Sequence, residues 1–142
     1  MNGMAWLPWA LGSAAFAGLT AILAKVGVKD VDSDFATAIR TSVILVFAWL
    51  WAAGRGVIQP SALSGRTWLF LVLSGLATAA SWMCYFHALK LGPASRVAPI
   101  DKLSVVVAVV LAAVFLHEKL SALHLAGVVL IALGAMLLAR PA

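Results

Sequence analysis

Hydrophobic and polar positions divide the chain into five long apolar segments separated by short polar turns. The segments cover residues 7–28, 35–53, 68–89, 97–116 and 123–139. A bilayer core about 30 Å thick takes about 20 apolar residues of helix, with a range of about 17–25. Because lipid offers the backbone no hydrogen-bond partners, such segments cross a membrane as helices. The pattern therefore predicts an all-α membrane protein with five transmembrane helices in a single domain, residues 1–142.

Residues that typically begin or end helices support these boundaries. Pro8 falls in the first turn of the first helix, where its missing N–H costs no internal hydrogen bond. Ser33 or Asp34 is predicted to cap the second helix, and Ser121 the fifth. The pair Gly92–Pro93 ends the third helix.

Composition agrees with a membrane protein and excludes other classes. Hydrophobic residues make up 64% of the 142 residues and charged residues 11%, whereas soluble domains carry about 25% charged residues. The net charge of +5 comes from basic residues scattered singly near helix ends. That distribution is typical of membrane loops and argues against nucleic-acid binding. The single cysteine, Cys84, is interpreted as a small apolar residue, since it cannot form an intrachain disulfide.

Charged residues inside the apolar segments are the most informative side chains. Arg40, Asp101 and Lys102 each lie about one turn or more inside a segment, where a central charge costs about 2.5–3.5 kcal/mol. They either face a polar cavity that binds a zwitterionic or anionic solute or relays a proton, or they snorkel, with Asp101 favoured by a helix N-terminus. Asp101 and Lys102 are adjacent and point about 100° apart, so both cannot face one pore squarely.

Other candidates carry two interpretations each. Lys25 anchors the first helix at the interface or contacts a substrate. Trp82 and Tyr85 line an aromatic cavity, or they belong to the aromatic belt at the membrane interface or serve in packing. Glu118 caps or pairs in the polar turn at 117–121, or it acts as a gate. His87 packs through a hydrogen bond or handles a proton. No metal-ligand spacing, nucleophile–base signature or phosphate loop is visible. We therefore expect no cofactor, no metal site, no catalytic residues and no enzymatic activity.

Two glycines of the last helix indicate how the protein assembles. Gly127 and Gly134 lie seven residues apart, on one face of the helix. Small residues let helix backbones approach closely in membranes. This face is the predicted dimer contact.

Five segments together resemble the EamA repeat of the drug/metabolite transporter superfamily. In order, they are FAGLTAILAKVG at 16–27, ATAIRT at 36–41, YFHALKLGPAS at 85–95, LHEKLS at 116–121 and GVVLIALG at 127–134. Family members usually hold two repeats, ten helices with inverted halves, and this chain has one. The resemblance implies a half-size secondary transporter of small organic solutes (amino acids, metabolites or drugs) that pairs, as a homodimer or with another half, to complete a two-fold pathway.

One departure from a related group limits the mechanism. The related small multidrug resistance proteins use a carboxylate in the middle of the first helix to exchange protons for cationic drugs. The first helix here has no acidic residue, and its one charge is Lys25. We do not expect that carboxylate mechanism. The alternative to transport is a scaffold or assembly subunit for another membrane protein, although a scaffold has no need of charges within its spans.

Basic residues leave the orientation in the bilayer open. One side holds seven, Lys25, Lys29, Arg40, Lys90, Arg96, Lys102 and Arg140, and the other three, Arg55, Arg66 and Lys119. The positive-inside rule then places the N-terminus outside. Without Lys25, Arg40 and Lys102, which lie within helices, the ratio is four to three, which is compatible with dual topology. We expect a multi-pass protein of the cell (inner) membrane.

Overall fold

The computed structural model describes residues 4–60 and 63–140, and helices dominate this part of the chain. The helices are α1 (Leu7–Gly27), α2 (Ser33–Gly54), α3 (Gly65–Leu91), α4 (Ala94–Asp101), α5 (Ser104–Phe115) and α6 (Ala122–Ala139). Among the described residues, five segments are long and apolar enough to cross a membrane, with α4 and α5 together forming the fourth. The predicted all-α fold with five candidate spans is confirmed.

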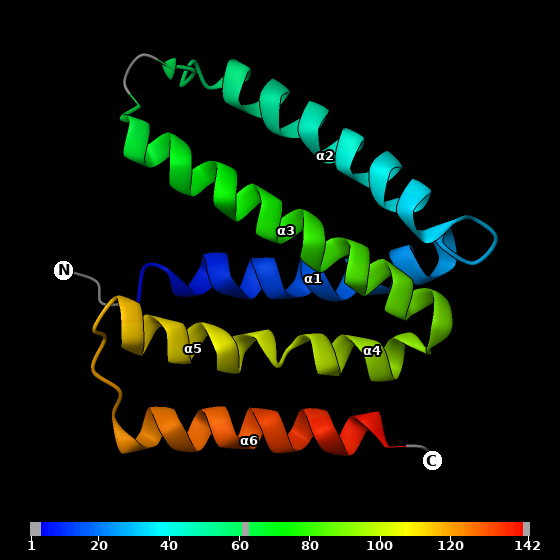
Figure 1. Cartoon of the computed structure of the whole chain (residues 1–142), viewed down its shortest axis with the longest axis vertical. Helices are drawn as coiled ribbons and strands as arrows, with labels where there is room; N and C mark the ends of the chain where they lie inside the picture. The colour runs from blue at the N-terminus through cyan, green and yellow to red at the C-terminus, as the bar shows by residue number, and fades with distance from the viewer. Residues whose placement is uncertain (1–3, 61–62, 141–142) are drawn as a thin grey trace. The chain divides into compact units, whose positions relative to one another are not determined.

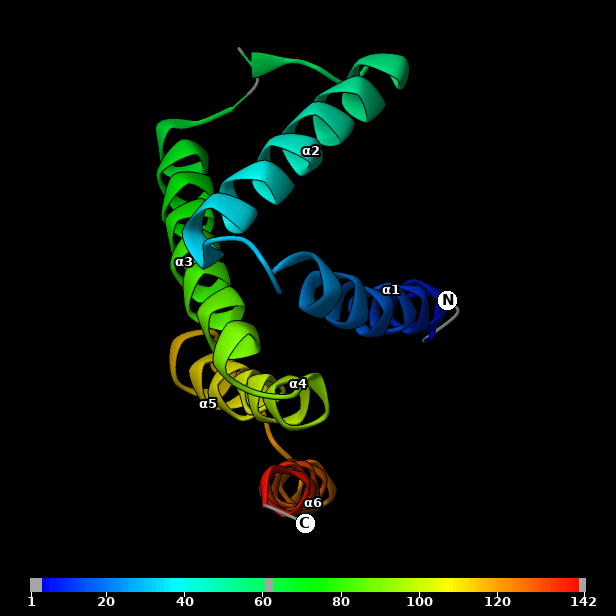
Figure 2. The same cartoon turned by 90° about the vertical axis from the view of Figure 1, so that its right-hand side faces the viewer.

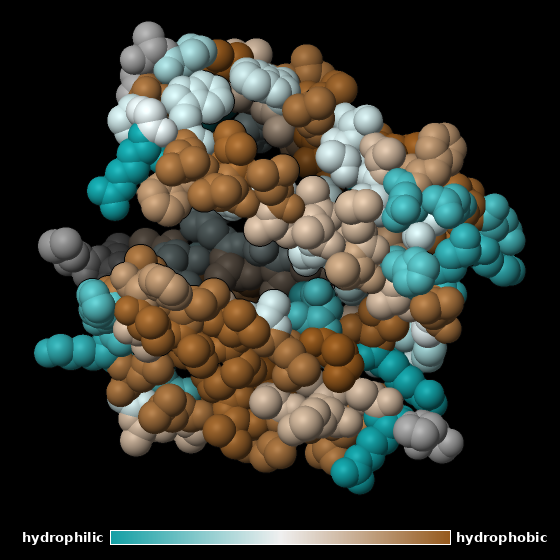
Figure 3. Space-filling view, in the orientation of Figure 1, coloured by the Kyte–Doolittle hydropathy of each residue, from teal (hydrophilic) through white to brown (hydrophobic). Residues whose placement is uncertain are grey.

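The helices direct their apolar side chains outward. At most 6% of each candidate span is buried inside the protein. The buried apolar side chains of the described residues are few, for example Phe86 and Leu89. Figure 3 shows hydrophobic residues covering the lengths of α4, α5 and α6 on one face, with hydrophilic residues at the helix ends. Such surfaces suit lipid as the surrounding solvent.

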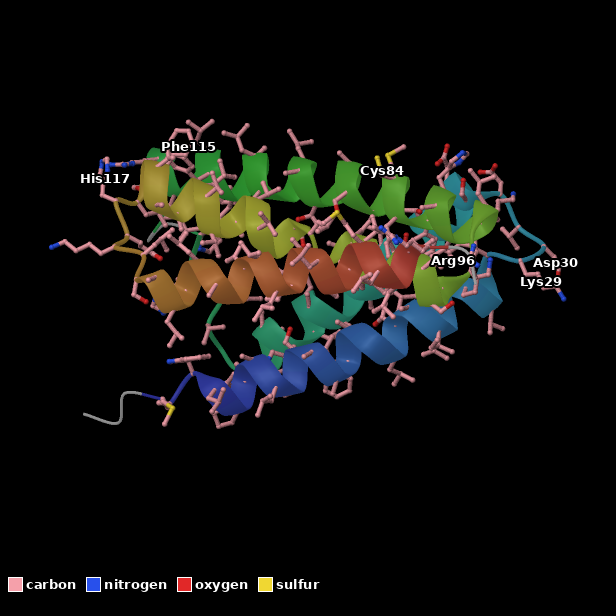
Figure 4. All side chains as sticks on the ribbon, turned by 90° about the horizontal axis from the view of Figure 1, so that it is seen from below. Lys29, Asp30, Cys84, Arg96, Phe115 and His117 are labelled. Carbon is pink, nitrogen blue, oxygen red and sulfur yellow. The ribbon has the colours of Figure 1, made fainter. Side chains whose placement is uncertain are left out.

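The helices form two compact units, one made of α2 and α3 and the other of α1, α4, α5 and α6. In the first unit, α2 and α3 run antiparallel. They approach each other where α2 begins and α3 ends, and they diverge toward the loop that joins them (Figure 1, Figure 2). In the second unit, α6 packs along α4 and α5 (Figure 1). Cys84 is exposed on α3 and points outward (Figure 4).

The fourth span is interrupted at Lys102 and Leu103, where the sequence pattern predicted one continuous helix. Pro99 lies inside α4 and has no N–H to donate to the carbonyl of Ser95. Beyond it the backbone bonds close over three residues instead of four: the N–H of Lys102 donates to Pro99 (3.1 Å) and that of Val105 to Lys102 (3.0 Å). A tightened stretch of this kind inside a helix is a common feature of hinges.

The two ends of the fourth span carry polar residues. Arg96 lies near the start of α4, and His117 lies just beyond the end of α5 (Figure 4). The backbone of His117 has φ 55°, in the left-handed region, which closes the helix end as glycine commonly does. The span therefore runs between two polar turns despite its interruption.

Helix caps partly follow the sequence prediction. Ser121 caps α6 as predicted: its hydroxyl oxygen accepts from the backbone N–H of His124 (3.3 Å), and His124 Nδ1 accepts from the Ser121 N–H (3.3 Å). The prediction of Ser33 or Asp34 as the α2 cap is wrong, because Asp32 performs this role. Asp32 Oδ1 accepts from the N–H groups of Asp34 (2.9 Å) and Phe35 (3.2 Å).

The Asp32 cap predicts a pH-dependent stability. The N–H groups of Phe35 and Asp34, with smaller contributions from Lys90 and His87, hold the pKa of the Asp32 carboxyl below its usual value. Stability from a lowered pKa is present above the unfolded-state value of about 3.9 and is lost as the pH falls through the folded-state value. We expect Asp32→Ala to lower the thermal unfolding temperature at pH 7, and the difference from wild type to shrink toward pH 3. Asp30→Ala, in the same loop, is the control. An equal difference at both pH values would contradict the assignment.

Candidate functional site

A cleft of about 740 Å³ lies between α2 and α3. Polar groups from both helices line it together with small and apolar residues: Asp34, Thr37, Ala38 and Thr41 from α2, and Leu71, Ser74, Gly75, Thr78, Ala79, Trp82 and Met83 from α3. Ala38, Gly75 and Ala79 have small side chains or none, so they leave space open between the two helices. The volume is in the range of pockets that hold small organic molecules.

Three threonines of the cleft lining hold their hydroxyl groups in a fixed orientation. The Oγ1 of Thr37 donates to the carbonyl of Ser33 (2.8 Å), that of Thr41 to Thr37 (2.8 Å), and that of Thr78 to Ser74 (2.9 Å). Each is a bond to the carbonyl four residues earlier in the same helix, a common way for hydroxyls to satisfy themselves inside membrane helices. The hydroxyl protons are therefore satisfied within each helix.

Arg40 lies next to the cleft and is held by aromatic rings. Its guanidinium carbon is 4.2 Å from the centre of the Trp82 ring and 5.3 Å from that of Phe86. These two rings lie four residues apart, on one face of α3, and Phe86 is 3% exposed. Among the described residues, no carboxylate forms a salt bridge with Arg40. The rings thus stabilise a half-buried cation whose charge is not neutralised by an acid.

A polar cluster joins the start of α2 to the end of α3. Lys90 Nζ donates to the carbonyl of Val31 (2.9 Å). The buried Ser33 hydroxyl lies 3.4 Å from His87 Nδ1. These bonds fix the entry of α2 against α3 and so set the width of the cleft at this end. His87 therefore forms the hydrogen bond that its packing interpretation requires.

Lys25 forms a comparable contact in the other unit. Its Nζ donates to the carbonyl of Gly92 (2.9 Å), in the turn between α3 and α4. Lysines near helix ends often satisfy terminal carbonyls in this way. This contact ties the end of α1 to the beginning of the fourth span. It is consistent with the anchoring interpretation of Lys25.

Asp101 and Lys102 lie at the interruption of the fourth span and pair with each other. Lys102 Nζ is 3.4 Å from Asp101 Oδ2, and the two side chains are 55% and 35% exposed, respectively. Lys102 and Gly134 are among the residues that line a groove of about 430 Å³ between α4 and α6. Arg40 and Asp101 belong to different units.

The remaining predicted residues lie apart from the cleft or beside it. Tyr85 is half-buried, with its ring centre 6.5 Å from that of Phe86. Glu118 lines a second groove of about 430 Å³, between α5 and α6. Gly127 and Gly134 are half-buried on α6. A Cβ added at either glycine meets nothing within 4 Å, so the chain itself leaves their face accessible to close approach.

Sequence reasoning did not identify the α2 side of the cleft. Asp34, Thr37 and Thr41 were missed, although they follow a spacing of three and four residues that places them on one helix face. Of the predicted candidates, Trp82 lines the cleft and Arg40 contacts Trp82. The structure brings these two together and places Lys25, Asp101 and Lys102 in the other unit.

The spans define a multi-pass helical membrane protein, and its cleft between α2 and α3 is mostly apolar with a few polar groups. The profile of the EamA-like transporter family matches residues 4–140, and the chain belongs to that family. This is a family of transporters rather than enzymes. The resemblance to EamA proteins and the prediction that the chain is not an enzyme are therefore confirmed.

Two curated relatives are themselves described as uncharacterized transporters. The chain is 60% identical over 135 residues to an uncharacterized transporter in the cobO 3′ region of Sinorhizobium sp, covering 94% of this chain and 96% of that protein. It is 33% identical over 125 residues to the uncharacterized transporter YvbV of Bacillus subtilis (strain 168), covering 86% of this chain but 40% of that protein. No solved structure gives a significant match to the chain.

The contact between Arg40 and Trp82 can be measured as a coupling energy. We expect a double-mutant cycle of Arg40→Gln and Trp82→Leu to give a coupling energy of about 0.5–2 kcal/mol. Either single substitution already removes the cation–π contact, so the double variant loses nothing more from it. The measurement is the free energy of unfolding in detergent. Arg66→Gln combined with Trp82→Leu is the control, since Arg66 lies over Phe70 instead. Coupling no larger in the first cycle than in the control would show that the contact contributes nothing.

Proposed function

We propose that the protein is a secondary transporter of a small organic solute in the cell (inner) membrane, with the cleft between α2 and α3 as the solute site. The observation that carries this proposal is Arg40, a cation within an apolar span that rests on Trp82 beside the cleft. Charges within spans are costly and mark substrate or ion pathways. Membership of a transporter family supports the same reading.

The proposal includes pairing of two half-size subunits. The match to the Bacillus protein covers 40% of that protein, which leaves it room for a second region of similar length. A chain with one repeat can complete a two-repeat transporter by binding another copy of itself or a related one-repeat chain. Inverted pairs of repeats are a common basis for alternating access in transporters.

The interrupted fourth span is the proposed moving part. Asp101 and Lys102 lie where the backbone departs from regular helix, and interrupted helices in transporters often bear the coupling or binding groups. Lys25 bonds the turn at the start of this span, and Glu118 lies beyond its end. In this proposal Asp101, Lys102 and Lys25 transmit the movement of the fourth span, and Glu118 acts as a gate at its end.

Transport assays test the assignment of Arg40 and Asp101. We expect Arg40→Ala and Asp101→Asn each to lower solute flux in proteoliposomes at least about tenfold, because each removes a charge that only function requires in an apolar span. Arg66→Ala, a second arginine beside an aromatic ring, is the matched control. Each variant is first checked for insertion and monodispersity. Wild-type flux in both variants would leave snorkelling as the explanation of these charges.

Assembly is tested on the glycine face of α6. We expect Gly127→Leu and Gly134→Leu to weaken dimerisation about tenfold or more, since close backbone approach is lost. Added side chains meet open space within the chain itself, as they also do at Gly12, so Gly12→Leu is the control. The readout is the dimer dissociation constant in detergent. Unchanged dissociation constants in both α6 variants would exclude this face as the interface.

A further inference from the structure

We propose that the cleft between α2 and α3 selects solutes that carry a primary amine, which donates hydrogen bonds to acceptors on the cleft wall. This inference rests on the proposed function, because it assigns the chemistry of the same site. It follows from the direction of the hydrogen bonds that the cleft residues already make.

The threonines of the cleft present acceptors to a ligand. A hydroxyl has one hydrogen to donate and two lone pairs to accept with. The hydroxyls of three threonines each donate this hydrogen to a backbone carbonyl: Thr37 at 2.8 Å, Thr41 at 2.8 Å and Thr78 at 2.9 Å. Each oxygen keeps its lone pairs. Thr37 is buried, whereas Thr41 and Thr78 are exposed residues of the cleft lining, so a ligand bonds to these two by donating.

Asp34 adds a stronger acceptor at one end of the cleft. It lies in the first turn of α2 and lines the cleft with the threonines. A carboxylate accepts hydrogen bonds and carries the charge that attracts an ammonium. Among the described residues no salt bridge to Asp34 is present. A protonated amine bound here gains a charge-assisted hydrogen bond.

Donors on the wall are fewer than acceptors. Ser74 has a hydroxyl that rotates to donate or accept, and Trp82 has an indole N–H. Arg40 is not among the residues that line the cleft, because its guanidinium rests on the rings of Trp82 and Phe86. Trp82 and Met83 leave apolar surface for the body of the solute. The complement of this wall is an apolar or aromatic body with an amine head.

Matched ligands separate the effect of hydrogen-bond donation from the effects of the ligand's charge and shape. Purified protein in lipid nanodiscs is tested by equilibrium dialysis with labelled phenethylamine. Three analogues of the same body compete: 2-phenylethanol, phenylacetate and the N,N,N-trimethyl derivative of phenethylamine. We expect phenethylamine to bind at least about tenfold more tightly than each analogue, because only its ammonium both donates and carries positive charge.

Variants locate the binding to the cleft. Thr41→Val and Thr78→Val keep the shape of the side chain and are expected to weaken phenethylamine binding about three- to tenfold each, the effect of one hydrogen bond. Ser42→Ala is the matched control, because Ser42 makes the same kind of bond to Ala38 (3.0 Å) without lining the cleft. Thermal unfolding confirms that each variant is folded.

Several results would overturn the amine assignment. Equal binding of the trimethyl derivative would mean that charge alone matters, and preference for phenylacetate would assign the site to anions. Absence of binding by all four probes would also reject it. The proposed transport function is judged separately, by Arg40-dependent flux of a mixed solute pool. Flux without amine preference therefore rejects this inference and keeps the function, whereas absence of any flux rejects the function.

Discussion

Hydrocarbon offers no hydrogen-bond partner, and this constraint explains how several polar groups in and beside the five spans are arranged. The threonines of α2 and α3 return their hydroxyl protons to their own helices. Arg40 rests on Trp82 and Phe86, where aromatic faces replace part of its hydration. Lys25 and Lys90 reach backbone carbonyls at helix ends. Each group is stabilised within its own unit, so the helices can expose apolar surface to lipid.

The same constraint connects structure to the proposed function. Self-satisfied hydroxyls can line a cleft in an apolar environment at little cost, and they keep lone pairs for a ligand. A cation held by rings keeps its charge without a neutralising acid beside it. A proline in the fourth span relaxes the regular hydrogen-bond pattern next to a pair of opposite charges. In the proposed function, these features serve as the binding wall and the moving span of the transporter.

Sequence patterns predicted the spans well, because twenty-residue apolar segments leave few alternatives to membrane helices. Ser121 was identified as a cap by its position before an apolar run, whereas Asp32 was missed because Ser33 and Asp34 offered equally suitable side chains. The interruption after Pro99 was not predicted, since a proline in the first turns of a helix is usually tolerated there. Arg40 was identified as a candidate by its cost in lipid. The α2 wall of the cleft was not, because threonines at helical spacing are common in spans that bind nothing.

Protection of a cysteine in the cleft tests the central claim, that a transported solute binds between α2 and α3, most directly. Ala38→Cys is introduced in a Cys84→Ala background, since Cys84 is exposed, and Ser42→Cys is the control outside the cleft. The rate of modification by a methanethiosulfonate reagent is measured with and without a saturating solute that the protein transports. The account predicts that the solute slows modification at position 38 and leaves position 42 unchanged. Equal rates at position 38 with and without that solute would contradict it.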